Sequence, residues 1–176
     1  MTADKLTTFD VLIEIPRGSR NKYEYDFAIK RMRFDRMLFS SMMYPADYGF
    51  IPETLALDGD PLDVLVLVNE PTFPGCVMEV KPIGVFHMAD DKGPDEKVIC
   101  VPVSDPIWNS LENLTDINPH LLKEIEHFFQ VYKDLEHKQV DVEGWGDVNE
   151  AYAIIKECTE RFNQIENKPE GLFSIK

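Results

Sequence analysis

The alternation of hydrophobic and polar residues over the first hundred positions predicts a series of short strands. Residues 9–15 form a mostly apolar run that ends at Pro16 and a turn at Gly18. Residues 23–29 and 32–38 alternate polar and apolar side chains, which is typical of a hairpin. Three further strands are expected at 62–68, 77–88 and 97–103, and a long loop with short strands is expected at 40–61.

The last third of the chain changes to a helical period. Asn118 and Pro119 together are a helix-start signal, with Asn as the cap and Pro in the first turn. One face of this helix is apolar, formed by Leu121, Leu122, Ile125, Phe128, Phe129 and Tyr132. After a short strand near residues 140–145, Asp147 or Asn149 caps a second helix, with an apolar stripe of Ile154, Ile155, Cys158, Phe162 and Ile165.

The order of these elements predicts the fold class. Many short strands followed by few helices indicate an α+β fold, in which a small closed barrel has helices packed outside it. The chain has 176 residues and no visible repeat or linker. We therefore expect a single domain over residues 1–176.

Composition narrows the classes of function. The chain carries 32 acidic and 18 basic residues, a formal net charge of −14. This balance argues against a nucleic-acid binder, whose affinity depends on Lys and Arg neutralising phosphates. No apolar run is long enough to span a bilayer, and residues 1–8 lack the apolar core of a secretory signal. Three cysteines without metal-ligand spacing, Cys76, Cys100 and Cys158, predict free thiols and a cytoplasmic protein.

The sharpest chemical feature is the turn from Asp58 through Asp60 to Asp63. It places three carboxylates within six positions, and Asp63 interrupts an otherwise apolar run. Burying an ionised carboxylate is costly unless it is paired or binds a metal, so Asp63 favours a cation site. For Asp58 alone, a solvated turn is the simpler interpretation.

Oxygen ligands without nearby His or Cys suit Mg²⁺, Mn²⁺ or Ca²⁺ rather than Zn²⁺. An EF-hand is excluded, because Leu62, Asp63 and Asn69 stand where that loop needs Asp or Asn, Gly and Glu.

A second acidic group follows on the next hairpin, formed by Asp90, Asp91, Asp95 and Glu96. Alone it would be a solvated charge run. A barrel that brings both acidic turns to one end would concentrate negative charge there, and cations would be needed to neutralise it.

A few positively charged and phenolic side chains accompany the acids. Lys22 and Glu24 share one face of a strand, and Arg36 lies on its predicted neighbour. Tyr44 and Tyr48 flank a Gly/Pro turn, and the pair Tyr132 and Lys133 ends the first helix. Each is ordinary alone. Together, carboxylates, metals, Lys, Arg and Tyr are what a polyphosphate anion requires.

Read together, these motifs resemble the family I soluble inorganic pyrophosphatases over about residues 9–160. The segment 58–64, Asp-Gly-Asp-Pro-Leu-Asp-Val, matches the family signature Asp-x-Asp-Pro-x-Asp-x. Supporting motifs lie in the same order along the chain, at 13–16, 22–24, 35–36, 44–49, 90–97, 127–136 and 142–145. The short chain looks like the prokaryotic branch of the family.

The resemblance implies a fold and an activity. The fold is an OB-like five-stranded β-barrel with two main flanking α-helices. The activity is hydrolysis of pyrophosphate to two orthophosphates with several Mg²⁺ ions, for which Mn²⁺ or Zn²⁺ are possible substitutes. Bacterial members are commonly homohexamers, so self-association is also expected.

The resemblance also implies roles for single residues. Asp58, Asp63 and Asp90 resemble ligands of tightly bound metals, Asp95 a bridge to further ions, and Glu14 and Glu24 outer ligands that act partly through water. Asp60 resembles the general base that orients and deprotonates the attacking water. The groups that look like phosphate binders are Lys22, Arg36, Tyr48, Lys97, Tyr132 and Lys133.

Three other functions remain open on the sequence alone. An OB-type barrel could bind single-stranded nucleic acid by stacking bases on Tyr44, Tyr48 and Phe50, although the acidic charge opposes it. A calcium-binding structural protein would not need the Lys, Arg and Tyr set. An inactive relative used for oligomer assembly would not need the intact carboxylates.

Overall fold

The computed structural model describes residues 8–176, so the segment judged not to be a secretory signal lies, except for Thr8, outside the described residues. The strands are β1 (Phe9–Ile15), β2 (Asn21–Asp26), β3 (Arg31–Met37), β4 (Asp47–Phe50), β5 (Asp63–Val66), β6 (Val77–Asp90), β7 (Gly93–Pro94), β8 (Lys97–Pro102) and β9 (Asp141–Gly146). The α-helices are α1 (Pro119–Val131) and α2 (Val148–Asn163), and two short 3₁₀ helices are η1 (Leu114–Asp116) and η2 (Asp134–Glu136).

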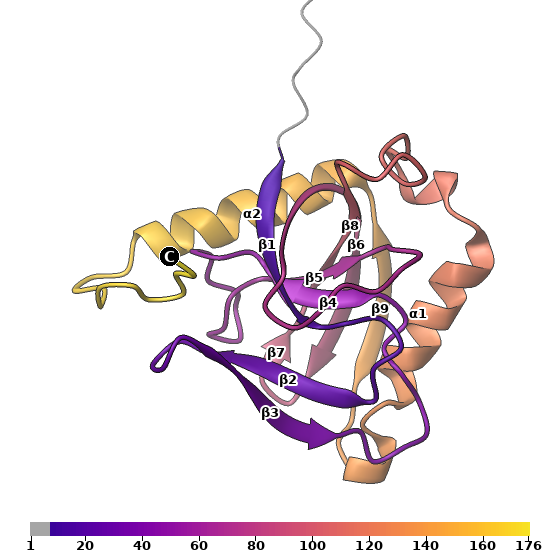
Figure 1. Ribbon diagram of the computed structural model, residues 1–176, viewed down its shortest axis with the longest axis horizontal. Helices are drawn as coiled ribbons and strands as arrows, with labels where there is room; N and C mark the ends of the chain where they lie inside the picture. Colours follow the sequence, from indigo (N-terminus) through magenta and orange to yellow (C-terminus); the bar gives the residue numbers. More distant parts are fainter. Residues whose placement is uncertain (1–7) are drawn as a thin grey trace, which may run out of the picture.

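Five strands close into a ring. β1 pairs with β4, β4 with β5, β5 with β8, β8 with β6, and β6 returns to β1. The β5–β8 pair is parallel and the other four pairs are antiparallel. β7 and β9 add to β6, whereas β2 and β3 form a separate two-stranded sheet beside the ring (Figure 1). The α+β fold with an OB-like five-stranded barrel and two flanking helices is therefore confirmed.

Strands β5 and β8 separate two hydrophobic clusters. On β5, Leu65 belongs to one cluster, whereas Val64 and Val66 belong to the other. On β8, Ile99 and Cys100 divide in the same way. Because successive side chains of a strand point to opposite faces, a strand with a core on each side is apolar at every position. This explains the unbroken apolar run that predicted β5.

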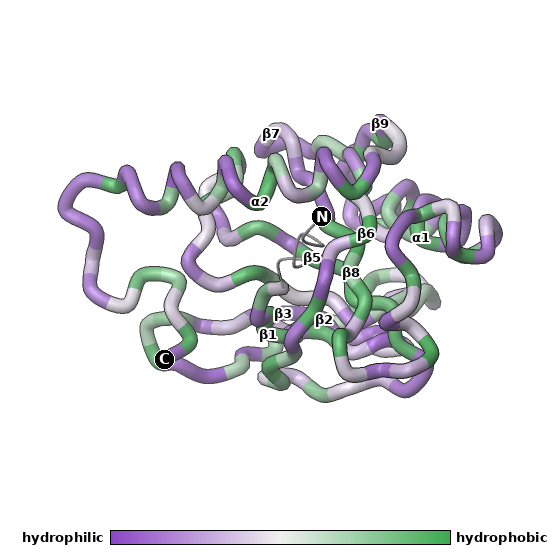
Figure 2. The backbone as a smooth tube through the Cα atoms, turned by 90° about the horizontal axis from the view of Figure 1, so that it is seen from above, coloured by the Kyte–Doolittle hydropathy of each residue, from purple (hydrophilic) through white to green (hydrophobic). Residues whose placement is uncertain are grey.

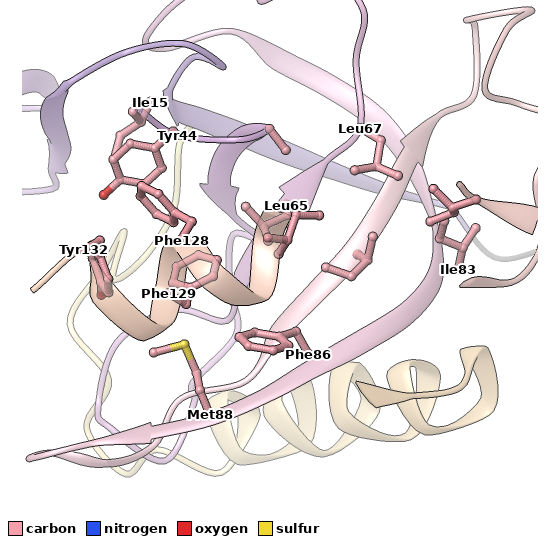
Figure 3. Close-up of a cluster of buried hydrophobic side chains, with 14 of the residues drawn as sticks. Ile15, Tyr44, Leu65, Leu67, Ile83, Phe86, Met88, Phe128, Phe129 and Tyr132 are labelled. Atoms are coloured by element: carbon pink, nitrogen blue, oxygen red, sulfur yellow. The ribbon is translucent and has the colours of Figure 1, made fainter. Parts of the chain in front are cut away.

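Each cluster receives one helix. Helix α1 contributes Phe128 and Phe129 to the cluster of Leu65, together with Tyr132, the residue that caps the helix C-terminus (Figure 3). Helix α2 contributes Ile155 and Cys158 to the cluster of Val64. Hydrophobic and hydrophilic stretches alternate along both helices, as expected for helices packed on a core by one face (Figure 2).

The helix starts follow their caps. Asn118 Oδ1 accepts a hydrogen bond from the His120 amide at 2.9 Å, as the sequence predicts. Asp147 Oδ1 accepts from the Glu150 amide at 3.0 Å, so Asp147 rather than Asn149 caps α2. At the other end, Ile165 lies beyond the last residue of α2 and was wrongly assigned to its stripe.

The hairpin turns earlier than the alternation predicts. Phe27 and Ile29, expected in the first strand, lie in the turn between β2 and β3. The reason is Asp26, whose Oδ1 accepts hydrogen bonds from the amides of Ala28 at 3.0 Å and Ile29 at 3.3 Å. A carboxylate that bonds the backbone two residues on ends the strand and starts the turn.

Two composition-based expectations can be compared with the fold. Cys76, Cys100 and Cys158 all carry free thiols. Within residues 8–176, no helix combines the length and the hydropathy needed to cross a membrane.

Candidate active site

One cavity of about 540 Å³ lies between the β2–β3 hairpin and the end of the ring. Its walls come from the hairpin, the acidic loop before β5, the β6–β7 turn, the start of β8 and the residues after α1. All thirteen residues to which the sequence assigns a role line this cavity: Glu14, Lys22, Glu24, Arg36, Tyr48, Asp58, Asp60, Asp63, Asp90, Asp95, Lys97, Tyr132 and Lys133. Segments more than one hundred positions apart in the chain thus meet in one place.

Glu14 joins the ring to the hairpin. It lies on β1 between the fully buried Ile13 and Ile15, so the strand alternation turns its carboxylate away from them. Glu14 Oε1 accepts a hydrogen bond from the Tyr25 amide of β2 at 2.7 Å. This contact holds the carboxylate against the hairpin, where it lines the cavity.

The acidic loop is folded by its own backbone. The Asp60 amide donates to Asp58 Oδ1 at 3.1 Å, and the Ala56 amide donates to the Asp60 carbonyl at 2.8 Å. Gly59 has φ +93°, a backbone conformation that residues other than Gly rarely adopt. The turn leaves the Asp60 carboxylate exposed toward the cavity, with Lys92 Nζ at 3.5 Å.

Lys97 is buried between two carboxylates. Its side chain is 2% exposed, and Nζ lies 2.5 Å from both Asp63 Oδ2 and Asp95 Oδ1. Asp63 and Lys97 face each other because they are register partners on β5 and β8. Tyr48, on the neighbouring strand β4, donates from its hydroxyl to Asp63 Oδ2 at 2.6 Å. Burial acts to lower the pKa of Lys97, but Asp63 and Asp95 raise it well above its ordinary value, so the ammonium stays charged.

A second lysine contacts the acidic β6–β7 turn. Lys133 Nζ donates to Asp90 Oδ2 at 3.2 Å and lies over the ring of Tyr132. The Lys92 amide also donates to Asp90, at 2.9 Å. Burial opposes ionisation of Asp90, but these two donors hold its pKa below the ordinary value.

The hairpin contributes two cations to the cavity. Lys22 and Arg36 are register partners on β2 and β3. Lys22 Nζ forms ion pairs with Glu24 and, at 3.4 Å, with Asp35. Arg36 Nη1 lies 2.5 Å from Asp35 and its other nitrogens pair with Glu136 of η2. Asp26, at the turn end of β2, pairs with Arg33 at 2.9 Å and does not line the cavity.

Three carboxylates in the cavity are hard to ionise. Burial raises the pKa of Glu14 to about 8 and that of Asp58 to about 6, and neighbouring carboxylates add to both shifts. Burial also raises the pKa of Asp95, although Lys97 opposes this. The cavity therefore holds more negative charge than its lysines and arginines neutralise, which is the condition that divalent cations relieve.

The carboxylates have the chemistry that divalent cations prefer, but their side chains do not converge on one point. Among the described residues, no three His, Cys, Asp or Glu side chains form a ready ligand group. Lys97 instead lies between Asp63 and Asp95, and Lys133 lies beside Asp90. Oxygen-only donors of this kind suit Mg²⁺, Mn²⁺ or Ca²⁺.

The structure adds residues to which the family resemblance assigned no role. Glu136 is nearly buried, with 5% of its side chain exposed, and holds Arg36. Tyr25, Phe27, Phe50 and Phe173 form an apolar wall of the cavity. Their sequence signals are those of ordinary core or turn residues, so only the fold reveals them.

Comparisons with known proteins identify relatives of this chain in both sequence and structure. A family model described as Inorganic pyrophosphatase matches residues 11–163. A curated relative from Methanosarcina mazei is 60% identical over 154 residues, which are 88% of this chain and 91% of the relative. Another, from Synechocystis, is 48% identical over 158 residues, which are 90% of this chain and 94% of the relative. Both relatives are named inorganic pyrophosphatase. The crystal structure of inorganic pyrophosphatase from Thermus thermophilus superposes with a TM-score of 0.87 at 43% identity, covering 93% of this chain and 96% of that one.

Proposed function

Because the chain belongs to the inorganic pyrophosphatase family, in its prokaryotic form, we propose that its cavity hydrolyses pyrophosphate to two orthophosphates in a Mg²⁺-dependent reaction. One observation carries the proposal. Six carboxylates predicted to bind metal and the four cationic side chains predicted to bind phosphate line the same cavity. A site for one charge alone would have no use for this mixture. A magnesium complex of pyrophosphate presents both charges, with metal ions for the carboxylates and phosphoryl oxygens for the cations.

The carboxylates are assigned to the metal ions. Asp58, Asp63 and Asp90 are the primary ligands, Asp95 reaches further ions, and Glu14 and Glu24 act as outer ligands. Bound divalent cations supply two effects, a lower pKa for the attacking water and compensation of the phosphate charge. The raised pKa values of Glu14, Asp58 and Asp95 support this assignment, since burial disfavours the negative charge of each carboxylate and a bound divalent cation would stabilise it.

Asp60 is assigned the general-base role. Its carboxylate is exposed to the cavity, held only loosely by Lys92 at 3.5 Å, and therefore free to accept a hydrogen bond from water. It orients the water oxygen toward one phosphorus, in line with the bridging oxygen, and accepts the proton as the new bond forms. No covalent intermediate on the protein is required.

Six other side chains bind the phosphoryl oxygens: Lys22, Arg36, Tyr48, Lys97, Tyr132 and Lys133. The lysines now pair with carboxylates, for example Lys97 with Asp63 and Lys133 with Asp90. Divalent cations held by these carboxylates would take over their neutralisation, which would leave the ammonium groups available to the phosphoryl oxygens. Charge that develops on the leaving phosphate then meets donors already placed around it.

The finer expectations complete the proposal. Mg²⁺ is the working ion, with Mn²⁺ or Zn²⁺ as substitutes, and the enzyme self-associates as a homohexamer in the cytoplasm. The three free thiols support a reducing compartment. Sedimentation of the purified protein tests the hexamer directly.

The decisive experiment measures phosphate release from pyrophosphate with Mg²⁺, with Mn²⁺ or Zn²⁺, and with a chelator. Fast release that requires the metal supports the proposal. Absence of release while the protein still binds Mg²⁺ would refute it and favour a role in assembly. Single-stranded nucleic acid is not the favoured ligand, because the cavity is acidic and the chain carries a net charge of −14.

A further inference from the structure

The C-terminal segment, residues 164–176, returns from α2 to the active-site cavity. It follows Asn163, the last residue of α2, and lies beyond the residues that match the family model. Figure 1 shows it in yellow, on the same side of the molecule as the turn of the β2–β3 hairpin. Phe173 of this segment lines the cavity. The family match therefore leaves unexplained a segment that touches the site.

Phe173 contacts two walls of the cavity at once. Its ring centroid lies 5.3 Å from that of Phe27 in the hairpin turn, at an interplanar angle of 59°. Its carbonyl accepts a hydrogen bond from the amide of Glu53, at 3.0 Å, in the loop that leads to the acidic turn. The ring of Phe162 in α2 lies 6.2 Å away on the other side. Phe173 thus connects the hairpin, the acidic loop and the last helix.

The backbone of Phe173 is in an unusual conformation. Its φ is +52°, in the left-handed region that bulky residues rarely adopt. Such a conformation persists where the surrounding contacts hold it in place. The position of Phe173 is thus determined by its ring and carbonyl contacts rather than by local backbone preference.

The hairpin is the part of the site that most needs support. β2 and β3 form a two-stranded sheet of their own, and an isolated pair of strands is marginally stable in water. The hairpin nevertheless carries Lys22, Glu24 and Arg36 into the cavity. At the open end of the hairpin, Arg36 is held by Glu136.

The turn end of the hairpin is held partly by the C-terminal segment. Phe27 packs on Phe50 of β4 at 5.5 Å as well as on Phe173. Lys30 Nζ donates to the carbonyl of Lys176 at 2.7 Å. Without the contacts to Phe173 and Lys176, the turn end of the hairpin would have fewer packing partners and would move more freely.

We propose that the C-terminal segment is a structural part of the active site and that Phe173 is a positioning residue, which holds the β2–β3 hairpin so that Lys22 and Arg36 meet the phosphate. The kinetic half of this proposal rests on the proposed pyrophosphatase function. Phe173 acts through Phe27 and touches no reacting atom.

The experiment compares Phe173→Ala with the conservative variant Phe173→Tyr and with the matched control Leu172→Ala in the full chain. Leu172 is the neighbouring residue of the same segment and does not line the cavity. For Phe173→Ala we expect KM for magnesium pyrophosphate to rise by roughly tenfold, with kcat within about twofold, because displaced binding groups weaken substrate capture. Phe173→Tyr and Leu172→Ala should both have the KM of the wild type.

Hydrogen exchange of the backbone amides gives a second readout that needs no substrate. We expect faster exchange across residues 21–37 in Phe173→Ala, with unchanged exchange in β5 and β8. Unchanged exchange in the hairpin overturns the proposal, and so does faster exchange with an unchanged KM. A wild-type protein that releases no phosphate would contradict the proposed function, whereas the exchange comparison would still decide whether Phe173 holds the hairpin.

Discussion

Arg36 and Glu136 lie one hundred positions apart and form a two-point ion pair beside the active-site cavity, which Arg36 lines. Arg36 Nε donates to Oε1 and Nη2 to Oε2, both at 3.0 Å. The pair joins the hairpin to the segment that carries Tyr132 and Lys133. A guanidinium held in this way keeps one edge on Glu136 and has lost much of its side-chain freedom before the substrate arrives.

Replacement of Arg36 tests whether this geometry serves phosphate binding. Arg36→Ala should raise KM for magnesium pyrophosphate by tenfold or more, on the order of the 1.4 kcal/mol that a tenfold change represents. Arg36→Lys should be almost as poor, because a single ammonium cannot satisfy Glu136 at two points. Steady-state kinetics measure both. Arg33→Ala is the control, since Arg33 lies on the same strand but pairs with Asp26 outside the cavity. Normal kinetics for Arg36→Lys would remove the two-point argument.

Asp60→Asn tests the general base. We expect kcat to fall by about 10²- to 10⁴-fold, the usual contribution of general acid–base catalysis. The melting temperature should not fall, because the side chain is 62% exposed. Its ion-pair partner, Lys92, is equally exposed, and the two charged atoms lie 3.5 Å apart. Glu70→Gln, an equivalent change at an exposed position outside the cavity, is the control. Turnover near the wild-type value would exclude Asp60 as the base.

Lys97→Met tests whether a lysine and a metal ion compete for the same carboxylates. In chelator, we expect a loss of stability of about 3–5 kcal/mol, because Asp63 and Asp95 lose the cation buried between them. Mg²⁺ should recover much of this loss by neutralising the two carboxylates. Denaturant unfolding with and without Mg²⁺ measures the difference.

Lys81→Met provides the comparison for Lys97→Met. Lys81 is another buried lysine of the barrel, 7% exposed on β6, and it does not line the cavity. Mg²⁺ should not offset its loss. If Mg²⁺ recovered neither variant, the metal ions would have to bind away from Asp63 and Asp95.

The stability of the metal-free protein should depend on pH through Glu14. Its pKa is raised from 4.5 to about 8, so folding favours the protonated carboxyl. This contribution is complete below pH 4.5 and is lost as the pH rises through about 8, where the buried group must ionise. The melting temperature in chelator should therefore fall between these limits.

Glu14→Gln isolates this effect. The amide keeps an oxygen that accepts from the Tyr25 amide but does not ionise. Between pH 5 and pH 8.5, Glu14→Gln should thus lose less of its melting temperature than the wild type, and Mg²⁺ should stabilise it less at high pH. Parallel slopes for the two proteins would show that Glu14 does not titrate in this range.

The barrel class and the acidic turns of the site were predictable from local patterns, whereas the roles of Glu14 and Lys97 came only from the family resemblance. The Asp58–Asp63 turn is recognisable in the sequence because Asp63 interrupts a run that is otherwise apolar. The run itself is apolar because Leu65 and Val66 belong to a strand with a core on each face. The positions of Asn118 and Pro119 marked the start of α1 to the residue. In each case the signal lies within a few neighbouring residues.

The remainder depends on contacts between distant segments. Nothing near Glu136 indicates that it faces Arg36, and Phe173 resembles any apolar residue of a C-terminal tail until the fold places it beside Phe27. The hairpin boundary was wrong for a related reason. The Asp26 carboxylate caps the turn, which outweighs the alternation that extended the strand through Phe27.

The closed ring also bears on how this chain avoids unwanted association. The five ring strands pair with one another, so the ring itself has no free edge, and only β7 and β9 extend the sheet beyond it. The hairpin does have free edges, and it alternates charges along them, such as Lys22 and Glu24 on β2 and Arg33 and Asp35 on β3. Charged side chains at sheet edges discourage the addition of further strands. Lys22 and Glu24, which line the cavity, therefore also discourage the addition of strands at the edge of the hairpin.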